Sequence, residues 1–334
     1  MTNNAPTETP KKGSFIKKIL QVGLPLVLGI LIIYFFVKDI DPRELWDILK
    51  NANWGILLFS LIFGLLGNTI RGYRWELLIR PLGYSPKISN LCFAIYGGYA
   101  VNFALPRAGE IWRCGIIARD EKIPFSKLFG TMILDRVLDT VTVLCITVIA
   151  FFLNMQFLLK QGEERLDSVT NLLTSPYLYL GILGCIVLII VIFKVFKNNF
   201  IIKKIREILW GMWEDMKAIW RMKTKTRLFI YSISIWASYF CYFYITFFAF
   251  GFTANLGFTA GLVTFALSSI SMGVPSNGGL GPWQVAVIAS LVLYGVDNVS
   301  ATAFATGVFA IQSLWVILCG LFGIAALSIK SRNK

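Results

Sequence analysis

The feature that most constrains this chain is a succession of apolar segments close to the length of a membrane span. They lie at about residues 20–37, 53–70, 88–105, 128–153, 177–196, 228–250, 257–274, 282–296 and 300–328. Mean hydropathy is +0.68 and 15% of the residues are charged, against about a quarter in soluble domains. We therefore expect an all-α polytopic membrane protein with about eight spans plus re-entrant or broken helices.

The basic residues predict the orientation of these segments. Lys and Arg number 32 against 18 Asp and Glu, giving a net charge of +14. They gather before the first segment, after the second, between the fifth and sixth, and at the C-terminus. Cytoplasmic loops retain such residues, which favours a membrane explanation and argues against nucleic acid as a partner. We expect a multi-pass protein of the cytoplasmic (inner) membrane with both termini cytoplasmic.

The same pattern suggests one transmembrane domain over residues 20–328, between a basic cytoplasmic tail at 1–19 and a short cytoplasmic tail at 329–334. No small-residue cleavage site ends the first segment, so it is expected to stay as an uncleaved span. Residues 199–222 alternate apolar and charged side chains at helical spacing. That segment is predicted to be an amphipathic helix on the cytoplasmic surface.

Several chemistries are disfavoured by the residues that are missing or unpaired. The chain has no histidine, which removes the commonest proton shuttle and metal ligand. Its six cysteines form no CxxC pair and lie in or beside apolar runs, as small buried hydrophobes do. We expect no metal, no cofactor and no catalytic constellation, and hence a protein that is not an enzyme.

Two apolar segments are interrupted in a way that predicts hairpins. Segment 88–105 has basic residues on both sides, so it is expected to enter from the cytoplasm and return there after Pro106. Within 257–296, Pro275 and Pro282 frame a glycine-rich break that a helix cannot easily cross. This second hairpin would enter from the opposite face, or would instead be two short crossing spans.

Paired breaks of this kind are typical of inverted repeats. The two halves would be about 53–153 and 228–328. In such proteins the broken ends meet near the middle of the membrane and form the ligand site. Polar residues close to the two breaks are therefore candidates for that site.

A charged stripe follows the first break. Pro106 is suited to the first turn of a helix, and Arg107, Glu110 and Arg113 then follow at i, i+3 and i+6, which puts them on roughly one face. Two positive charges and one negative charge beside a helix start could receive a phosphate. The alternative is an interfacial helix whose charges face water.

A second charged group lies within an apolar span. Asp135 and Asp139 are four residues apart and Arg136 sits beside them. Each charge at membrane depth costs roughly 2.5–3.5 kcal/mol unless it is paired or wet. The group is either a functional site or a structural ion pair, for instance with Arg107 or Arg113.

The second break carries neutral polar groups and glycines that allow a close backbone approach. Its candidate ligand-binding residues are Ser276, Asn277, Gly278, Gly279, Gly281 and Gln284. At the end of the second segment, Asn68, Arg71 and Arg74 are expected to form a positive anchor at the membrane surface, with Tyr73 and Trp75 at the interface. A role in headgroup binding is the alternative.

Three motifs occur in order: NFALPRAGEIWR at 102–113, LDRVLD at 134–139 and VPSNGGLGPWQ at 274–284. Together they resemble the transmembrane, flippase-like region of lysylphosphatidylglycerol synthases. The residues that match that family's pattern are Asn102, Pro106, Gly109, Glu110, Arg113, Arg136 and Asp139. Asp135 stands where a Glu is usual, and Gln284 stands near a position that is often Glu. The resemblance implies a stand-alone member without the soluble aminoacyl-transferase domain.

These observations lead to one expected function and two rivals. We expect a lipid translocase that binds a phospholipid or a polyprenyl-phosphate-type lipid, with Arg107, Arg113 and Arg136 holding the phosphate. Glu110, Asp135 and Asp139 would pair with the arginines and with any cationic part of the headgroup, and Asn102 is a further candidate lipid-binding residue. The rivals are a scaffold for a lipid- or glycan-modifying enzyme and an intramembrane lipid transferase. Expected partners are membrane lipids, with a homo-oligomer or a partner enzyme as further possibilities.

Overall fold

The computed structural model describes residue 34 and residues 41–165 and 224–332, all of whose regular elements are helices. By length and composition, four helical stretches in these ranges could cross a membrane: Trp54–Leu82, Phe125–Met155, Lys225–Ala249 and Asn298–Ser331. This confirms the predicted all-α polytopic class. The tail at 1–19, nearly all of segment 20–37, segment 177–196, the amphipathic helix at 199–222 and the last two residues lie outside the described ranges.

The described helices follow one another in two similar groups. The first group is α3 (Trp54–Ile79), α4 (Ile88–Ala104), α5 (Ala108–Glu121) and α6 (Phe125–Arg165), preceded by the short α2 (Pro42–Lys50). The second is α10 (Lys225–Tyr244), α12 (Gly257–Ser271), α13 (Pro282–Leu293) and α14 (Asn298–Arg332). The turns η1 (Arg80–Leu82) and η2 (Ile245–Ala249) and the short α11 (Gly251–Ala254) complete the described elements. In each group, two shorter helices lie between two long ones.

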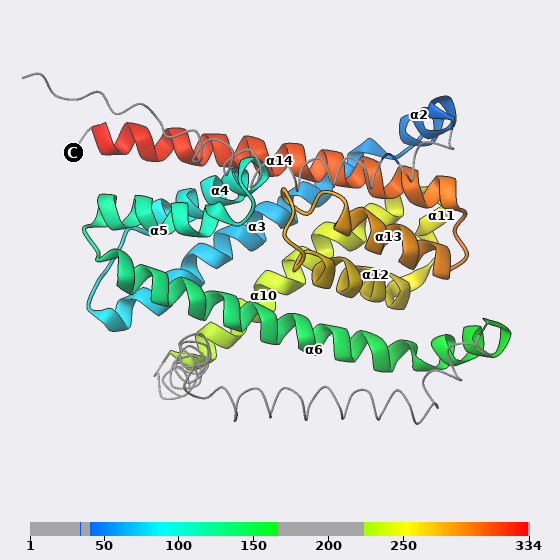
Figure 1. Cartoon of the computed structure of the whole chain (residues 1–334), viewed down its shortest axis with the longest axis horizontal. Coiled ribbons are helices and arrows are strands. Elements are labelled where there is room, and N and C mark those ends of the chain that lie inside the picture. The colour runs from blue at the N-terminus through cyan, green and yellow to red at the C-terminus, as the bar shows by residue number, and fades with distance from the viewer. Residues whose placement is uncertain (1–33, 35–40, 166–223, 333–334) are drawn as a thin grey trace, which may run out of the picture.

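Each pair of shorter helices is an antiparallel hairpin. In the first, Asn90 near the start of α4 donates to Glu121 at the end of α5 (2.6 Å), while Gly98 and Gly109 approach closely near the tip. In the second, the hydroxyls of Thr264 on α12 and Ser290 on α13 are 2.8 Å apart. In Figure 1 the two hairpins lie toward opposite ends of the long helices.

The tips of the two hairpins meet. The Arg107 guanidinium donates to the carbonyl of Gly273, and the side-chain amide of Asn277 donates to the carbonyl of Phe103 (3.2 Å). Gly278 has φ +62° and a β-carbon there would overlap the ring of Phe103. Glycine is thus required at this contact both by its backbone conformation and by space. The two sequence breaks therefore come together, as expected from their composition.

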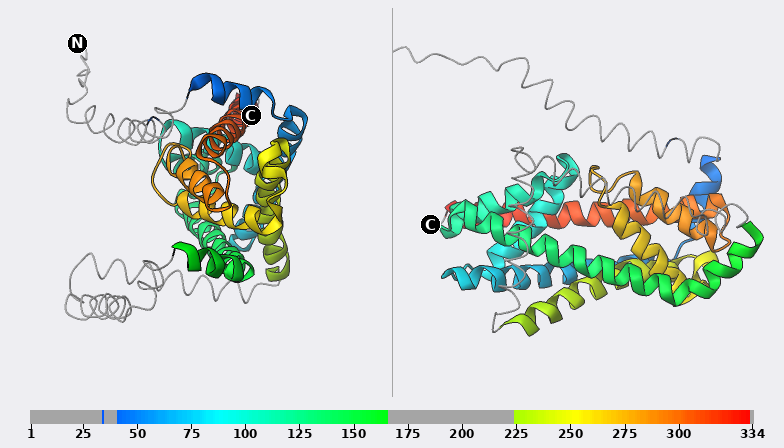
Figure 2. Two further views of the ribbon diagram at one scale, coloured as in Figure 1. Left: turned by 90° about the vertical axis from the view of Figure 1, so that its right-hand side faces the viewer. Right: turned by 60° about the horizontal axis from the view of Figure 1, so that its bottom comes forward.

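Each hairpin packs on the last helix of the other group. Helix α4 lies against α14, and α12 lies against α6 (Figure 2). On α14, Lys330 donates to Ser89 (2.8 Å) and to Asn90 (3.2 Å). On α6, Asn154 accepts from the Tyr294 hydroxyl (3.0 Å). Polar contacts therefore tie the base of each hairpin to the opposite group.

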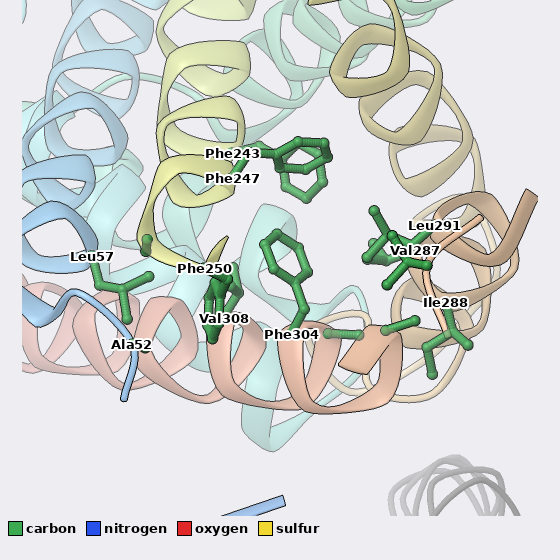
Figure 3. Close-up of a cluster of buried hydrophobic side chains, with 14 of the residues drawn as sticks. Ala52, Leu57, Phe243, Phe247, Phe250, Val287, Ile288, Leu291, Phe304 and Val308 are labelled. Carbon is green, nitrogen blue, oxygen red and sulfur yellow. The ribbon is translucent and has the colours of Figure 1, made fainter. Parts of the chain in front are cut away.

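A large aromatic cluster holds the second group together. Phe243 and Phe247 pack edge-on against Phe304 of α14, with ring centroids 6.2 and 5.3 Å apart. Val287 and Leu291 of α13 are fully buried in the same cluster (Figure 3). Because such side chains bury large apolar areas, this cluster anchors α13 and α14 beside the second tip.

Pro106 was predicted to lie in the first turn of the helix that follows it, and this prediction is wrong because the helix begins two residues later. Helix α5 begins at Ala108, and Arg107, which precedes it, is left-handed (φ +58°). Leu105 is extended (φ −135°, ψ 111°), as residues before proline usually are. Pro106 therefore ends α4 and forms the reversal, whereas Pro282 does occupy the first turn of α13.

The close approach at Gly109 generates a prediction. We expect Gly109→Ala to lower the melting temperature in detergent, because a β-carbon there would overlap the carbonyl oxygen of Gly98 and overpacking costs roughly 1–3 kcal/mol. Gly115→Ala on the same helix is the control, since nothing lies within 4 Å of a β-carbon there. Equal melting temperatures for the two variants would contradict the packing of this hairpin.

Candidate functional site

Two arginines of α3 point into the protein and meet two aspartates of α6. Arg74 donates to Asp135 Oδ1 at 2.9 Å (Nε) and 2.6 Å (Nη2), and to Asp139 Oδ1 at 2.7 Å. Arg71 contacts Asp139 Oδ2 at 2.5 Å and Asp135 Oδ2 at 3.3 Å. The side chains of Arg71, Arg74 and Asp135 are 2%, 0% and 0% exposed. Residues three and four apart share a helix face, so both pairs can face each other.

The interpretation of these arginines as surface anchors is wrong. Helix α3 continues to Ile79, so Arg71 lies about 12 Å before its end at 1.5 Å per residue. Trp75 is fully buried and donates its indole N–H to Thr131 (2.9 Å). Of the predicted interfacial aromatic residues, only Tyr73 is substantially exposed. The arginines therefore belong to the buried centre of the first group.

Arg113 joins the same aspartates, and Arg107 does not. The Arg113 guanidinium donates to Asp135 Oδ2 (3.1 Å) and lies over the Trp75 ring, 4.6 Å from its centroid. Arg107 is exposed and is used at the contact between the hairpin tips. The two arginines do not form the single stripe expected from their spacing, because Arg107 precedes α5 and the helical periodicity does not extend to it.

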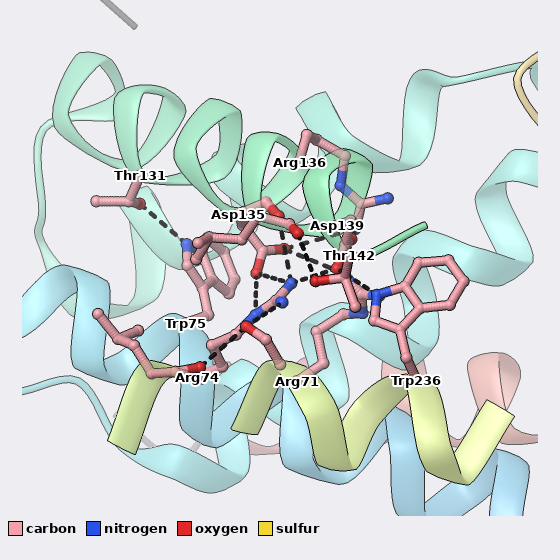
Figure 4. Close-up of polar contacts among 12 residues, drawn as sticks. Arg71, Arg74, Trp75, Thr131, Asp135, Arg136, Asp139, Thr142 and Trp236 are labelled. Carbon is pink, nitrogen blue, oxygen red and sulfur yellow. Dashed lines mark hydrogen bonds and ion pairs between the residues drawn. The ribbon is translucent and has the colours of Figure 1, made fainter. Parts of the chain in front are cut away.

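Arg136 and Glu110 lie at the edge of this network and are held more loosely. Arg136 Nη2 is 3.4 Å from Asp139 and 3.5 Å from Asp135, and its Nη1 is 3.9 Å from Glu110 Oε1. The side chains of Arg136 and Glu110 are 37% and 22% exposed. Figure 4 shows Arg136 on the far side of the aspartates from Arg71 and Arg74. We call the seven residues Arg71, Arg74, Glu110, Arg113, Asp135, Arg136 and Asp139 the charged network.

Helix α10 closes one side of the charged network with neutral hydrogen-bonding groups. Ser232 accepts from Arg74 (3.1 Å), Trp236 donates its indole N–H to Asp139 (3.4 Å), and Tyr239 accepts from Arg71 (3.3 Å). Figure 4 shows this helix beside α3. These residues were missed from the sequence, where they look like ordinary polar positions of an apolar span.

The charged network is unbalanced. Four guanidinium groups face three carboxylates, so with all groups ionised it carries one net positive charge. Three side-chain atoms enclosed in it have no hydrogen-bond partner: Arg113 Nε, Arg136 Nε and Glu110 Oε2. Buried polar atoms nearly always find a partner, and a buried charge is costly when it is not matched. An anion that also supplied hydrogen bonds would correct both deficits.

The remaining candidate residues gather at the hairpin tips. Asn102 accepts from the backbone N–H of Gly109 (2.8 Å), and Gln284 accepts from that of Gly281 (2.8 Å). These two side chains are used at the starts of α5 and α13, as capping groups are. Gly279 and Gly281 adopt positive φ. The Ser276 hydroxyl donates to Val274 (3.3 Å), and Asn277 Oδ1 is buried without a partner.

Within the described ranges, the charged network has no cluster of side chains suited to hold a metal ion. No group of three or more His, Cys, Asp or Glu side chains converges there, because the acids face arginines. A cavity of about 10 Å³ is lined in part by Asn68 and Tyr99. Both side chains contact the Tyr239 hydroxyl, which in turn accepts a hydrogen bond from Arg71. That volume holds about one water.

Comparison with known proteins identifies the family. The model of the lysylphosphatidylglycerol synthase transmembrane region matches residues 22–320. This chain belongs to that family. All three motifs that carry the resemblance lie within the matched range, and so do all seven residues of the charged network.

Three individual proteins are similar to parts of this chain or to most of it. The UPF0104 membrane protein MJ1595 of Methanocaldococcus jannaschii is 29% identical over 40% of this chain and 42% of its own length. A UPF0104 membrane protein of Methanothermobacter thermautotrophicus is 24% identical over 90% of this chain and 93% of its own. Glycosyltransferase AglD of Haloferax volcanii is 26% identical over 38% of this chain and 21% of its own. The chain thus matches less than half the length of two of these relatives.

The charged network generates a second prediction. Asp135→Asn should destabilise the protein by roughly 3–5 kcal/mol, because it removes the carboxylate that faces three buried guanidinium groups. Asp47→Asn on α2 is the matched control, since Asp47 is exposed. Thermal unfolding in detergent, followed by circular dichroism, measures both. An Asp135→Asn variant as stable as Asp47→Asn would show that the network is not needed for the fold.

Proposed function

We propose that this protein binds the phosphate-bearing headgroup of a membrane lipid at the charged network and moves that lipid between leaflets. The observation that carries the proposal is the excess of buried guanidinium over carboxylate, with one arginine, Arg136, partly exposed and weakly held. Arginine guanidinium groups are well matched to phosphate oxygens. Ionisable groups inside membrane segments typically serve a transport path.

The arrangement of the hairpins supports movement of the headgroup across the membrane. The tips meet through a few polar contacts, at Arg107–Gly273 and at Asn277–Phe103. A lipid headgroup is far larger than the cavity of about 10 Å³ beside the network. Passage of a headgroup between the tips therefore requires the two contacts between the tips to break. In this proposal the acyl chains stay in the lipid while the headgroup passes between the tips.

Two other functions compete with this one. Similarity to a glycosyltransferase favours a protein that supports an enzyme of lipid-linked glycan chemistry. A catalytic role for Asp135 or Asp139 has less support, because all four of their carboxylate oxygens face guanidinium groups. The scaffold alternative would gain if a glycosyltransferase co-purified in stoichiometric amounts and the purified protein alone moved no lipid.

The test of the proposed function is lipid movement by the purified protein. Vesicles of phosphatidylcholine would contain the protein and an acyl-labelled fluorescent phosphatidylglycerol, and dithionite would report the fraction exposed outside. We expect Arg136→Gln to slow movement by about tenfold or more, because it removes a charge-assisted contact to the phosphate.

Arg119→Gln is the control variant, since the Arg119 side chain is 59% exposed and its ion pair among the residues that the structure describes is with the neighbouring Asp120, outside the charged network. It should move lipid at the wild-type rate. Wild-type protein that moved no more lipid than empty vesicles would overturn the proposal. So would an Arg136→Gln variant that moved lipid as fast as the wild type.

A further inference from the structure

Arg136 and Glu110 are the part of the charged network that a ligand can reach. Arg136 contacts carboxylate oxygens at 3.4, 3.5 and 3.9 Å, whereas the Arg74 contacts to the aspartates are 2.6 and 2.7 Å. Arg136 and Glu110 are also the members with substantial exposure, and the other side chains are at most 10% exposed. The buried arginines and aspartates pair with one another, which leaves this outer pair for a ligand.

The outer pair offers one unused donor and one unused acceptor side by side. Arg136 Nε has no acceptor and Glu110 Oε2 has no donor, although both atoms are enclosed. Arg136 Nη1 and Glu110 Oε1 are 3.9 Å apart, so the two side chains are neighbours and one ligand can contact both. A phosphate oxygen can accept from Arg136. Only an O–H or N–H group of the ligand can donate to Glu110.

The net positive charge of the charged network also restricts the charge of the headgroup that can bind there. One net positive charge is neutralised by a group with a single negative charge. A phosphodiester carries one such charge, whereas a phosphomonoester carries about 1.5 to 2 at neutral pH. The zwitterionic phosphatidylethanolamine headgroup supplies an N–H donor to Glu110 but leaves the positive charge of the network unmatched. A charge left unmatched inside a membrane protein is costly.

Building on the proposed function, we infer that the selected lipid is a phosphodiester with one negative charge and a hydroxyl close to its phosphate. The phosphate accepts from Arg136 and the hydroxyl donates to Glu110 Oε2. Phosphatidylglycerol and polyprenyl phosphohexoses both have this chemistry. Glu110 thereby determines specificity, whereas Arg136 supplies the affinity for phosphate.

The test compares two lipids that differ only in the hydroxyls. Acyl-labelled phosphatidylglycerol and phosphatidylpropanol have the same charge and similar size, but the propanol headgroup has no O–H. In the dithionite assay we expect wild-type protein to move phosphatidylglycerol about tenfold faster, the effect of one hydrogen bond to a charged group. Glu110→Gln should reduce this ratio to about twofold, since the amide is a weaker acceptor than the carboxylate. Glu44→Gln, at an exposed position on α2, should keep the wild-type ratio.

The outcomes separate this inference from the proposed function. Equal movement of the two lipids by wild-type protein would overturn the inference and leave the translocase standing, whereas movement of neither would overturn the translocase itself. Faster movement of labelled phosphatidylethanolamine than of phosphatidylglycerol would also overturn the inference, because it would exclude selection by charge. A fluorescent polyprenyl phosphohexose in the same vesicles identifies the natural source: competition with phosphatidylglycerol that depends on Glu110 supports a lipid-linked sugar.

Discussion

Guanidinium groups enclosed between apolar helices must be met by carboxylates, and the centre of this molecule is organised around that requirement. Asp135 forms ion pairs with Arg71 and Arg74 of α3 and with Arg113 of α5. One aspartate on α6 therefore fixes the positions of two other helices. Removing it would leave several charges unmatched, so the network specifies how these helices pack even if its net contribution to stability is small.

The arrangement of the two hairpins is a second organising feature of the molecule. Each hairpin reaches the middle of the molecule from a different end, and its tip contacts the other tip. The contacts there are few and largely made through backbone carbonyls, as at Gly273 and Phe103, whereas the bases are tied by side chains such as Lys330 and Asn154. The tips are thus less strongly held than the bases. This is the distribution expected if the tips part while the bases stay fixed.

The sequence predicted the all-α class and the pairing of Arg113 with Asp135, but it did not predict that Arg71 and Arg74 pair with the aspartates. Segment 88–105 corresponds to α4 (Ile88–Ala104), because hydropathy is a local property that a single chain displays directly. Arg71 and Arg74 were misjudged because an apolar run that ends in charges looks the same whether or not the helix continues inward. Only the fold shows that Asp135, some sixty residues later in the chain, returns to face them. Gln284 could not be recognised as a capping residue before the start of α13 was known.

Each hairpin packs on the last helix of the other group, and this arrangement has a consequence for biosynthesis. A ribosome completes α4 and α5 long before it reaches α14, yet α14 supplies the surface on which α4 finally packs. The packing of α4 on α14 can therefore form only when the end of the chain arrives. Insertion of this protein is accordingly not a sequence of independent steps, and a nascent chain that stalls before α14 would present quality-control proteases with an unfinished first half.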